Sequence, residues 1–381
     1  MKLTLIPTVA LALGLTTAAR AQFTLSELLI DAPGTDDGQE FIEIRGPANT
    51  QLTGYYFLAI EGDGTAAGVV DQAIDLSAYS TGSNGLLLIR DTSAVLSPAP
   101  DAATSVVVFN PTPDIENGTN TFVLGFGTAP AVNTDLDTDN DGTLDAGIPG
   151  FTVVDAVSGT DGGAADLLYA AQLGGTNFAY NGVFTPDCYY RIYSASGTPL
   201  CWTVADVTAP GVTGPYSFDF VSSTTGEIQG GLASGYGPQA LNPGSLNEAL
   251  SLCSDVYGVS SANGGSQVLT MDAGTGNANN LYLFVGSFAG TTPGIPLTPT
   301  VTLPLNFDAY LSLLVGTYNT PILTPSIGTL DAAGRASCTF TLPSGGLLPP
   351  DTVLDHAALV VDLAAGSITF ATTPARVVVQ L

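Results

Sequence analysis

A run of alternating aspartates is the clearest candidate for chemistry in this sequence. Residues 135–145 read Asp-Leu-Asp-Thr-Asp-Asn-Asp-Gly-Thr-Leu-Asp. Alternation places carboxylates on one side of a loop, Gly142 permits a tight turn, and the Thr143 carbonyl can join the carboxylates around a hard cation. The pattern predicts a structural calcium site with six ligand residues: Asp135, Asp137, Asp139, Asp141, Thr143 and Asp145.

The spacing does not predict an EF-hand between two helices. Numbered from Asp137 as an EF-hand loop, the segment has Ile148 where the bidentate glutamate is required. We expect instead an isolated calcium loop of an extracellular β module, with a Kd of roughly 10⁻⁴ to 10⁻³ M. The alternative is a solvated Asp-rich turn, although five aspartates within residues 135–145 repel one another strongly without a cation.

No residue pattern predicts a catalytic centre, and we assign no catalytic residues. His356 is the only histidine, and no Gly-x-Ser-x-Gly turn presents a serine to it. Glu40 and Glu43, with Asp36 and Asp37, could supply paired carboxylates, but Glu40 and Glu43 fall on opposite faces of a strand. A solvated strand face explains these acids better, so we expect a protein that is not an enzyme.

Residues 1–21 have the pattern of a cleaved secretory signal peptide. Lys2 is followed by an apolar run from Leu3 to Leu15, and Ala19-Arg20-Ala21 gives the small-x-small pattern of a cleavage site. The run is too short to span a bilayer, and no later segment reaches that length. We therefore predict a secreted or cell-surface protein without a transmembrane segment.

The charge of the chain is strongly negative. It has 34 acidic and 7 basic residues, and Lys2 and Arg20 lie in the predicted signal peptide, which leaves five arginines and no lysine. Such a charge repels phosphate backbones and anionic lipids, so nucleic-acid binding is not expected. Hydrophobic residues make up 45% of the chain, which is ample for a buried core.

Four cysteines in an exported protein favour disulfides over free thiols. Sequence alone permits three pairings of Cys188, Cys201, Cys253 and Cys338. We favour Cys188 with Cys201, which bracket an expected hairpin, and Cys253 with Cys338. A zinc site is not expected, because there is no Cys-x-x-Cys and only one histidine.

The elements that position these residues are predicted to be β-strands. Short runs rich in Val, Ile, Leu, Phe and Tyr recur between Gly, Pro, Asn and Asp clusters, and no segment keeps a helical period for more than about two turns. The spacing predicts an all-β chain with two stacked-sheet modules in tandem, at 22–250 and 266–381, joined by a linker at 251–265. The expected strands are 23–30, 40–45, 55–60, 85–90, 105–109, 121–126, 152–157, 267–271, 281–287, 300–305, 336–342, 357–363 and 375–381.

The first module resembles the lamin-tail domain in its bacterial secreted form. The resemblance implies an immunoglobulin-like β-sandwich that serves as a binding or structural module and is not itself catalytic. The role of nuclear lamins does not transfer, because the chain has no coiled-coil rod. The similar segments are, in order, Leu25–Asp36, Gly38–Ile44, Leu52–Tyr56, Asn84–Arg90, Glu116–Leu124, Val153–Val157 and Leu241–Ser245.

Residues 260–381 resemble a C-terminal β-sandwich module found on secreted proteins of planctomycetes and related bacteria. This second resemblance supports the predicted localisation and leaves sorting, anchoring or spacing open as roles. The similar segments are Leu281–Ser287, Thr292–Leu297, Gly328–Ala336 and His356–Ala357.

Two functions follow from these observations. The first is a secreted or cell-surface, non-enzymatic protein that binds calcium structurally and interacts with an extracellular or envelope protein or polysaccharide. The second is an extracellular hydrolase or its carbohydrate-binding accessory module, which would require a concave groove lined by aromatic side chains and two inward carboxylates.

Overall fold

The structure, a computed structural model, consists almost entirely of β-strands. It describes residues 23–32, 38–93, 96, 99–111, 114–179, 185–207, 217–218, 228–230 and 239–380. The predicted signal peptide, Asp36 and Asp37 lie outside the described residues, as does part of the first lamin-tail-like segment.

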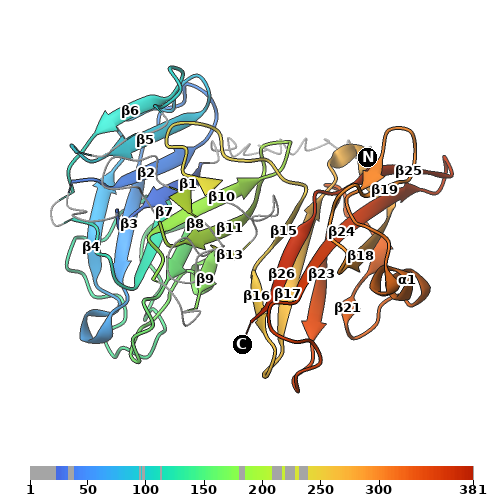
Figure 1. The fold of residues 1–381 in the computed structure, drawn as a ribbon. Helices are drawn as coiled ribbons and strands as arrows, with labels where there is room; N and C mark the ends of the chain where they lie inside the picture. Colours follow the sequence, from blue (N-terminus) through green and yellow to red (C-terminus); the bar gives the residue numbers. More distant parts are fainter. Residues whose placement is uncertain are drawn as a thin grey trace, which may run out of the picture.

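The first pair of sheets packs face to face (Figure 1). A seven-stranded sheet, antiparallel except between β5 and β6, has the order β13 (Ile228–Gly230), β11 (Pro199–Ala205), β10 (Cys188–Tyr193), β1 (Thr24–Leu29), β2 (Phe41–Arg45), β5 (Leu86–Arg90) and β6 (Ser105–Val108). A five-stranded sheet, antiparallel except between β8 and β9, has the order β4 (Val70–Asp75), β3 (Tyr55–Glu61), β7 (Asn120–Gly127), β8 (Phe151–Gly159) and β9 (Thr176–Phe178).

Alternating apolar side chains form the core between these two sheets. In β2, Ile42 and Ile44 point into the core, and Glu43 between them points away from it. Aromatic rings join the sheets: Tyr189 of β10 meets Phe122 of β7 edge-on, with ring centroids 5.3 Å apart. The period of two along each strand therefore explains why these segments bury one face against the opposite sheet.

The second pair of sheets is formed by the rest of the chain (Figure 1). A four-stranded sheet has the order β15 (Leu252–Ser254), β17 (Gly265–Asp272), β23 (Arg335–Leu342) and β21 (Leu323–Thr324). A six-stranded sheet has the order β16 (Gly258–Ser260), β26 (Ala375–Gln380), β24 (Val353–Asp362), β18 (Leu281–Ser287) and β22 (Ile327–Thr329), with β25 (Ser367–Ala371) also paired to β24.

One α-helix occurs in the described part of the chain, α1 (Ala309–Gly316). It begins after Asp308, whose carboxylate accepts a hydrogen bond from the Leu311 N–H at 2.8 Å. Leu311 packs with Val285 and Ala357 of the six-stranded sheet. The remaining elements are short: η1 (Gly64–Ala66), η2 (Ala171–Leu173), η3 (Thr275–Asn277) and the strand pairs β12 (Ser217–Phe218) with β14 (Gln239–Ala240) and β19 (Ile295–Pro296) with β20 (Thr302–Leu303).

The all-β fold with stacked sheets is confirmed, and the division into tandem domains stays a prediction. The expected hairpin after Cys188 is the β10–β11 hairpin. The predicted linker at 251–265 differs from the structure, because it contains β15 and β16, which belong to the second pair of sheets. These strands have three residues each, which is too short for an alternating pattern to stand out.

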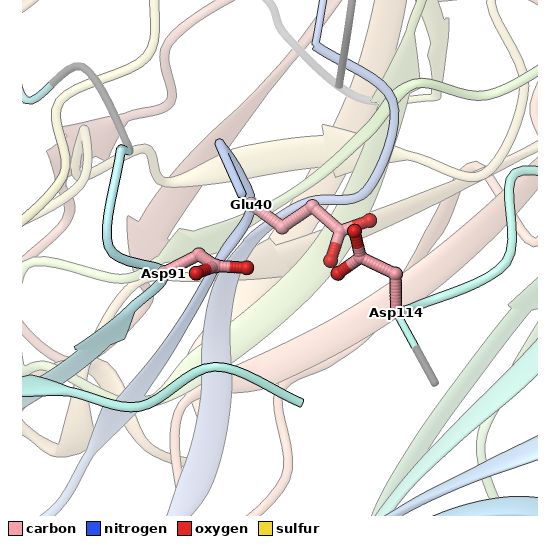
Figure 2. Close-up of side chains that lie close together, drawn as sticks. All are labelled: Glu40, Asp91 and Asp114. Carbon is pink, nitrogen blue, oxygen red and sulfur yellow. The ribbon is translucent and has the colours of Figure 1, made fainter. Parts of the chain in front are cut away.

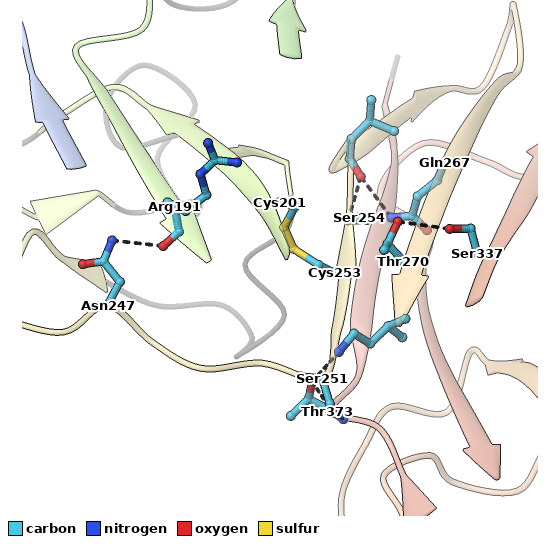
Figure 3. The surroundings of a disulfide bond; sticks show 12 residues. Arg191, Cys201, Asn247, Ser251, Cys253, Ser254, Gln267, Thr270, Ser337 and Thr373 are labelled. Carbon is cyan, nitrogen blue, oxygen red and sulfur yellow. Dashed lines mark hydrogen bonds between the residues drawn. A yellow bond between two sulfur atoms is a disulfide. The ribbon is translucent and has the colours of Figure 1, made fainter. Parts of the chain in front are cut away.

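Both favoured disulfide pairings are wrong, because the disulfide joins Cys201 to Cys253 (Figure 3). Within the β10–β11 hairpin, Cys188 lies opposite Ala205 and Cys201 lies opposite Ile192, so these two cysteines are not cross-strand partners. Strand β17 lies between the strands of Cys253 and Cys338, which sets them about 10 Å apart. The Cα atoms of Cys201 and Cys253 are 6.2 Å apart, within bonding range.

Cys188 and Cys338 are free, buried thiols. Burial raises the pKa of Cys338 to about 12 and the pKa of Cys188 well above its ordinary value. Because a thiol reacts as the thiolate, both side chains are unreactive at neutral pH and act as small apolar residues of the core.

The disulfide lies where the two pairs of sheets meet. One cluster of buried side chains continues from Ile192 and Ala205 of the seven-stranded sheet through Leu250 and Leu252 to Met271 of the four-stranded sheet. The two sheet pairs are thus joined both covalently and by apolar packing. None of the helices in the described ranges is long and apolar enough to cross a membrane.

We predict that the double substitution Cys201→Ser with Cys253→Ser lowers the free energy of unfolding. The cysteines are separated by 52 residues, and closing a loop of that length stabilises a folded chain by about 4 kcal/mol through the entropy of the unfolded state. Urea unfolding of the oxidised chain and the variant measures the difference. Peptide mapping without reduction should recover a Cys201–Cys253 link, and recovery of Cys188–Cys201 would contradict the structure.

Candidate metal centre

The aspartate-rich loop covers the outer face of the five-stranded sheet. Residues 128–150, all of which are described, connect β7 to β8 and contain no helix. Leu136, Leu144 and Ile148 of the loop are buried together with Leu58 and Val123 of the sheet. Ile148, which stands at the glutamate position of an EF-hand, is therefore an apolar anchor that fixes the loop.

Three of the predicted ligands converge. Oxygen atoms from the carboxylates of Asp137, Asp139 and Asp145 all lie within 4.8 Å of one another. Asp137 is fully buried, and the other two side chains are exposed. The cluster therefore has one fixed carboxylate beneath two that face solvent, with oxygen atoms of the kind that calcium prefers.

A network of donors fixes the buried carboxylate of Asp137. Its Oδ1 accepts a hydrogen bond from the Asp141 N–H at 3.2 Å, and its Oδ2 accepts from the Gly142 N–H at 3.0 Å. The hydroxyl of Tyr169 donates to the same Oδ2 at 2.8 Å. Gly142 has a φ of +86°, a left-handed conformation that favours glycine, so the predicted role of Gly142 in the turn is supported.

The other three predicted ligands are not brought into this cluster. Asp135 Oδ1 accepts a hydrogen bond from the Asp137 N–H at 3.1 Å, and Asp141 Oδ1 accepts from the Thr143 N–H at 2.8 Å. Both carboxylates thus stabilise turns of the loop. Thr143 contributes its N–H to this turn, and its role as a carbonyl ligand stays a prediction.

Three residues that hold the aspartate loop in place lie outside its motif, so the motif does not predict them. Tyr169 holds Asp137, and Gln172 holds the loop through bonds to the Leu144 N–H at 2.9 Å and the Gly142 carbonyl at 3.1 Å. A Cβ on Gly68 would lie 2.7 Å from the Cβ of Asp137, so only glycine permits this close approach. These residues come from other connections of the five-stranded sheet, and the local sequence around the loop could not reveal them.

The electrostatics of the loop reflect mutual repulsion. The pKa of Asp139 is raised, chiefly by the charge of Asp141, with smaller contributions from desolvation and from Asp145 and Asp137. The pKa of Asp145 is lowered because the side chain and N–H of Thr138 donate to it. A divalent cation among these carboxylates would replace repulsion by attraction.

Two further acidic clusters lie on the five-stranded sheet and its connections. Glu61, Asp71 and Glu116 form one, and Asp63, Asp161 and Asp166 form the other. Burial, with a smaller contribution from Glu116, raises the pKa of Glu61 to about 9. In the second cluster Asp166 Oδ2 accepts hydrogen bonds from the hydroxyls of Thr119 and Thr160, each at 2.7 Å. Hydrogen bonds to neighbouring hydroxyl groups therefore explain much of the close approach of the carboxylates in this second cluster.

A surface groove of about 340 Å³ lies beside the loop. Asp135 and Asp145 line it, together with small and aliphatic residues such as Ala129, Pro130 and Leu136. None of its lining residues is aromatic. The groove therefore has two carboxylates but no platform on which a sugar ring could stack.

The prediction that Glu40 and Glu43 lie on a solvated face is wrong. Both side chains are buried, with exposed fractions of 2% and 0%. Glu43 lies opposite Glu27 in the β1–β2 register, and Glu27 is also fully buried. Backbone amides satisfy one oxygen of each carboxylate: the Asn242 N–H donates to Glu27 Oε1 at 3.2 Å, and the Gly244 N–H donates to Glu43 Oε2 at 2.7 Å.

His356 has the surroundings of a structural residue. It is fully buried, its Nε2 lies 3.3 Å from the hydroxyl of Tyr310, and its ring centroid lies 4.8 Å from that of Phe340. Burial lowers its pKa to about 3, so the ring is neutral at ordinary pH. These contacts favour a packing role, as expected for a lone histidine on a strand.

We predict that stability falls as pH rises and that Glu43 contributes to the fall. Burial raises the pKa of Glu43 from 4.5 to about 8, so the folded chain keeps a proton that the unfolded chain loses. The contribution of Glu43 to the free energy of unfolding is complete below about pH 4.5 and is lost as pH rises to about 8. Glu43→Gln should reduce this loss of stability between low and high pH by an amount on the order of a few kcal/mol.

Urea midpoints between about pH 4 and 9 measure this dependence. Asp101→Asn, which removes an exposed carboxylate, serves as the matched control and should keep the pH dependence of the unchanged chain. Parallel pH curves for the unchanged chain and Glu43→Gln would show that Glu43 titrates normally in the folded state.

Comparison with family models and with curated proteins identifies no related protein. No model of a protein family matches the chain, and a search of curated proteins finds no match. The lamin-tail resemblance of residues 22–250 and the resemblance of residues 260–381 therefore stay predictions from their sequence motifs.

Proposed function

We propose that this chain is a secreted or cell-surface, non-enzymatic β-sandwich protein that binds calcium structurally and serves in surface interaction or envelope architecture. The observation that carries the proposal is the convergence of the Asp137, Asp139 and Asp145 carboxylates within 4.8 Å in a loop of the D-x-D-x-D-G-x-x-D type. Oxygen ligands of this kind suit a hard cation such as Ca²⁺.

Calcium would act here by fixing a loop that covers the outer face of the five-stranded sheet. Asp137, Asp139 and Asp145 would hold the ion, and the bonds from Tyr169 and Gln172 keep the loop in register with the five-stranded sheet. Because Leu136, Leu144 and Ile148 cover the outer face of that sheet, ordering the loop also protects apolar surface. The ion therefore has a structural role in this proposal.

Several observations support an extracellular location and a role in binding. The Cys201–Cys253 disulfide is compatible with an oxidising compartment. The buried, neutral His356 and the groove without aromatic residues favour a binding or structural role over a hydrolase or a carbohydrate-binding accessory. The lamin-tail resemblance points the same way. The partner we propose is an extracellular or envelope protein or polysaccharide.

We predict that Ca²⁺ raises the melting temperature of the chain by several degrees. At about 10 mM Ca²⁺ the ion is ten- to hundredfold above the Kd expected for a weak extracellular site, and ligand binding to the folded state alone stabilises it. Asp139→Ala should abolish most of the rise. Without calcium the same variant should melt at the same temperature as the unchanged chain or higher, because it removes a repelling charge.

Differential scanning calorimetry in Ca²⁺ and in chelator measures both effects. Asp101→Ala, an exposed aspartate outside the acidic clusters of the described residues, is the charge-matched control and should respond to calcium like the unchanged chain. If millimolar Ca²⁺ does not change the melting temperature of the unchanged chain, Asp139→Ala or Asp101→Ala, the calcium site is refuted.

A further inference from the structure

Two buried carboxylates face each other at one end of the seven-stranded sheet. The β2–β5 register pairs Phe41 with Arg90, and one step further it sets Glu40 opposite Asp91. The Asp91 N–H donates to the Glu40 carbonyl at 2.9 Å, which confirms that step. Both residues are only 2% exposed. Like charges directly opposite each other destabilise a sheet.

A third carboxylate joins the pair from the connection between β6 and β7. Asp114 lies in the segment that leads into β7, and the N–H of the next residue, Ile115, donates to Glu40 Oε2 at 3.3 Å. Oxygen atoms of Glu40, Asp91 and Asp114 all lie within 4.8 Å of one another. Figure 2 shows the carboxylates of Glu40 and Asp114 close together and one oxygen of the Asp91 carboxylate turned toward them.

The buried carboxylate of Asp91 has an oxygen atom that no hydrogen bond accounts for. Its Oδ1 accepts from the N–H and hydroxyl of Thr92, but its Oδ2 is buried and has no hydrogen-bond partner. An oxygen in this state costs free energy unless a further ligand is present. Asp91 thus supplies an observation that is independent of the clustering of acids.

A cavity of about 10 Å³ lies at this point. Its lining includes Glu40 and Asp91 together with Ile42, Ile89, Phe109 and Ile115, whereas Asp114 is not part of it. Asp114 meets the other two carboxylates through its oxygen atoms, which lie within 4.8 Å of theirs. This volume holds one water molecule or one ion and excludes any organic ligand. Carboxylates among apolar walls are costly to keep charged without a counter-ion, and oxygen ligands without histidine or cysteine select a hard cation.

We propose that Glu40, Asp91 and Asp114 bind one divalent cation of the calcium class, which holds the segment leading into β7 against this end of the seven-stranded sheet. Glu40 and Asp91 flank β2 and β5 of that sheet, and Asp114 lies in the connection between β6 and β7. The site is separate in sequence and composition from the loop at residues 135–145. It therefore does not depend on the proposed calcium loop.

Counting bound calcium tests this site directly. Equilibrium dialysis of the purified chain at about 5 mM Ca²⁺, followed by elemental analysis, measures ions per chain. We expect Asp91→Asn to bind one ion fewer than the unchanged chain. Asparagine keeps the shape of the side chain and an oxygen for the Thr92 N–H, so it removes the charge without removing the hydrogen bond. Glu40→Gln is a second variant with the same expected loss.

The loop variant Asp139→Ala separates the two sites. It should lose a different ion, so that the double variant Asp91→Asn with Asp139→Ala loses two. In chelator, Asp91→Asn should melt at a higher temperature than the unchanged chain, whereas a purely structural carboxylate would make the variant melt lower. Calcium content unchanged in both Asp91→Asn and Glu40→Gln would overturn the proposal, whatever Asp139→Ala does.

Discussion

The structure depends on how buried carboxylates are neutralised in a chain with few basic residues. Among the described residues three arginines form ion pairs, and one of these pairs joins the two sheets of the first pair. Arg191 of β10 pairs with Asp155 of β8 and also lies over the ring of Trp202, 3.9 Å from its centroid. The three pairs are Arg191–Asp155, Arg335–Asp272 and Arg376–Asp355.

Buried carboxylates that form no ion pair with an arginine are stabilised by hydrogen bonds from backbone amides or by keeping a proton. Glu27 and Glu43 accept N–H groups from residues 242–244 and keep a raised pKa, and Asp137 accepts two amides of its own loop. In the two proposed cation sites, divalent cations would neutralise the remaining carboxylates. The same shortage of positive charge therefore connects the buried glutamates, the aspartate loop and the carboxylates at the end of β2 and β5.

Local pattern predicted the long strands well, because alternation and turn residues are local properties. Strands β1, β2, β18 and β23 agree with the expected ranges within about two residues. β4 was missed because Gln72 occupies a buried position in its alternating pattern. The disulfide could not be predicted, since the proximity of Cys201 and Cys253 arises from packing between the two pairs of sheets. Tyr169, Gly68 and Asp91 escaped notice for the same reason: each acquires its role from segments distant in sequence.

Anomalous scattering from crystals of the chain grown in about 10 mM Ca²⁺ shows whether the aspartate loop holds a calcium ion. We expect a calcium peak among the carboxylates of Asp137, Asp139 and Asp145, with oxygen atoms about 2.3 to 2.6 Å away. A loop in the same conformation without a peak, or with only a water molecule at its centre, would refute the calcium site.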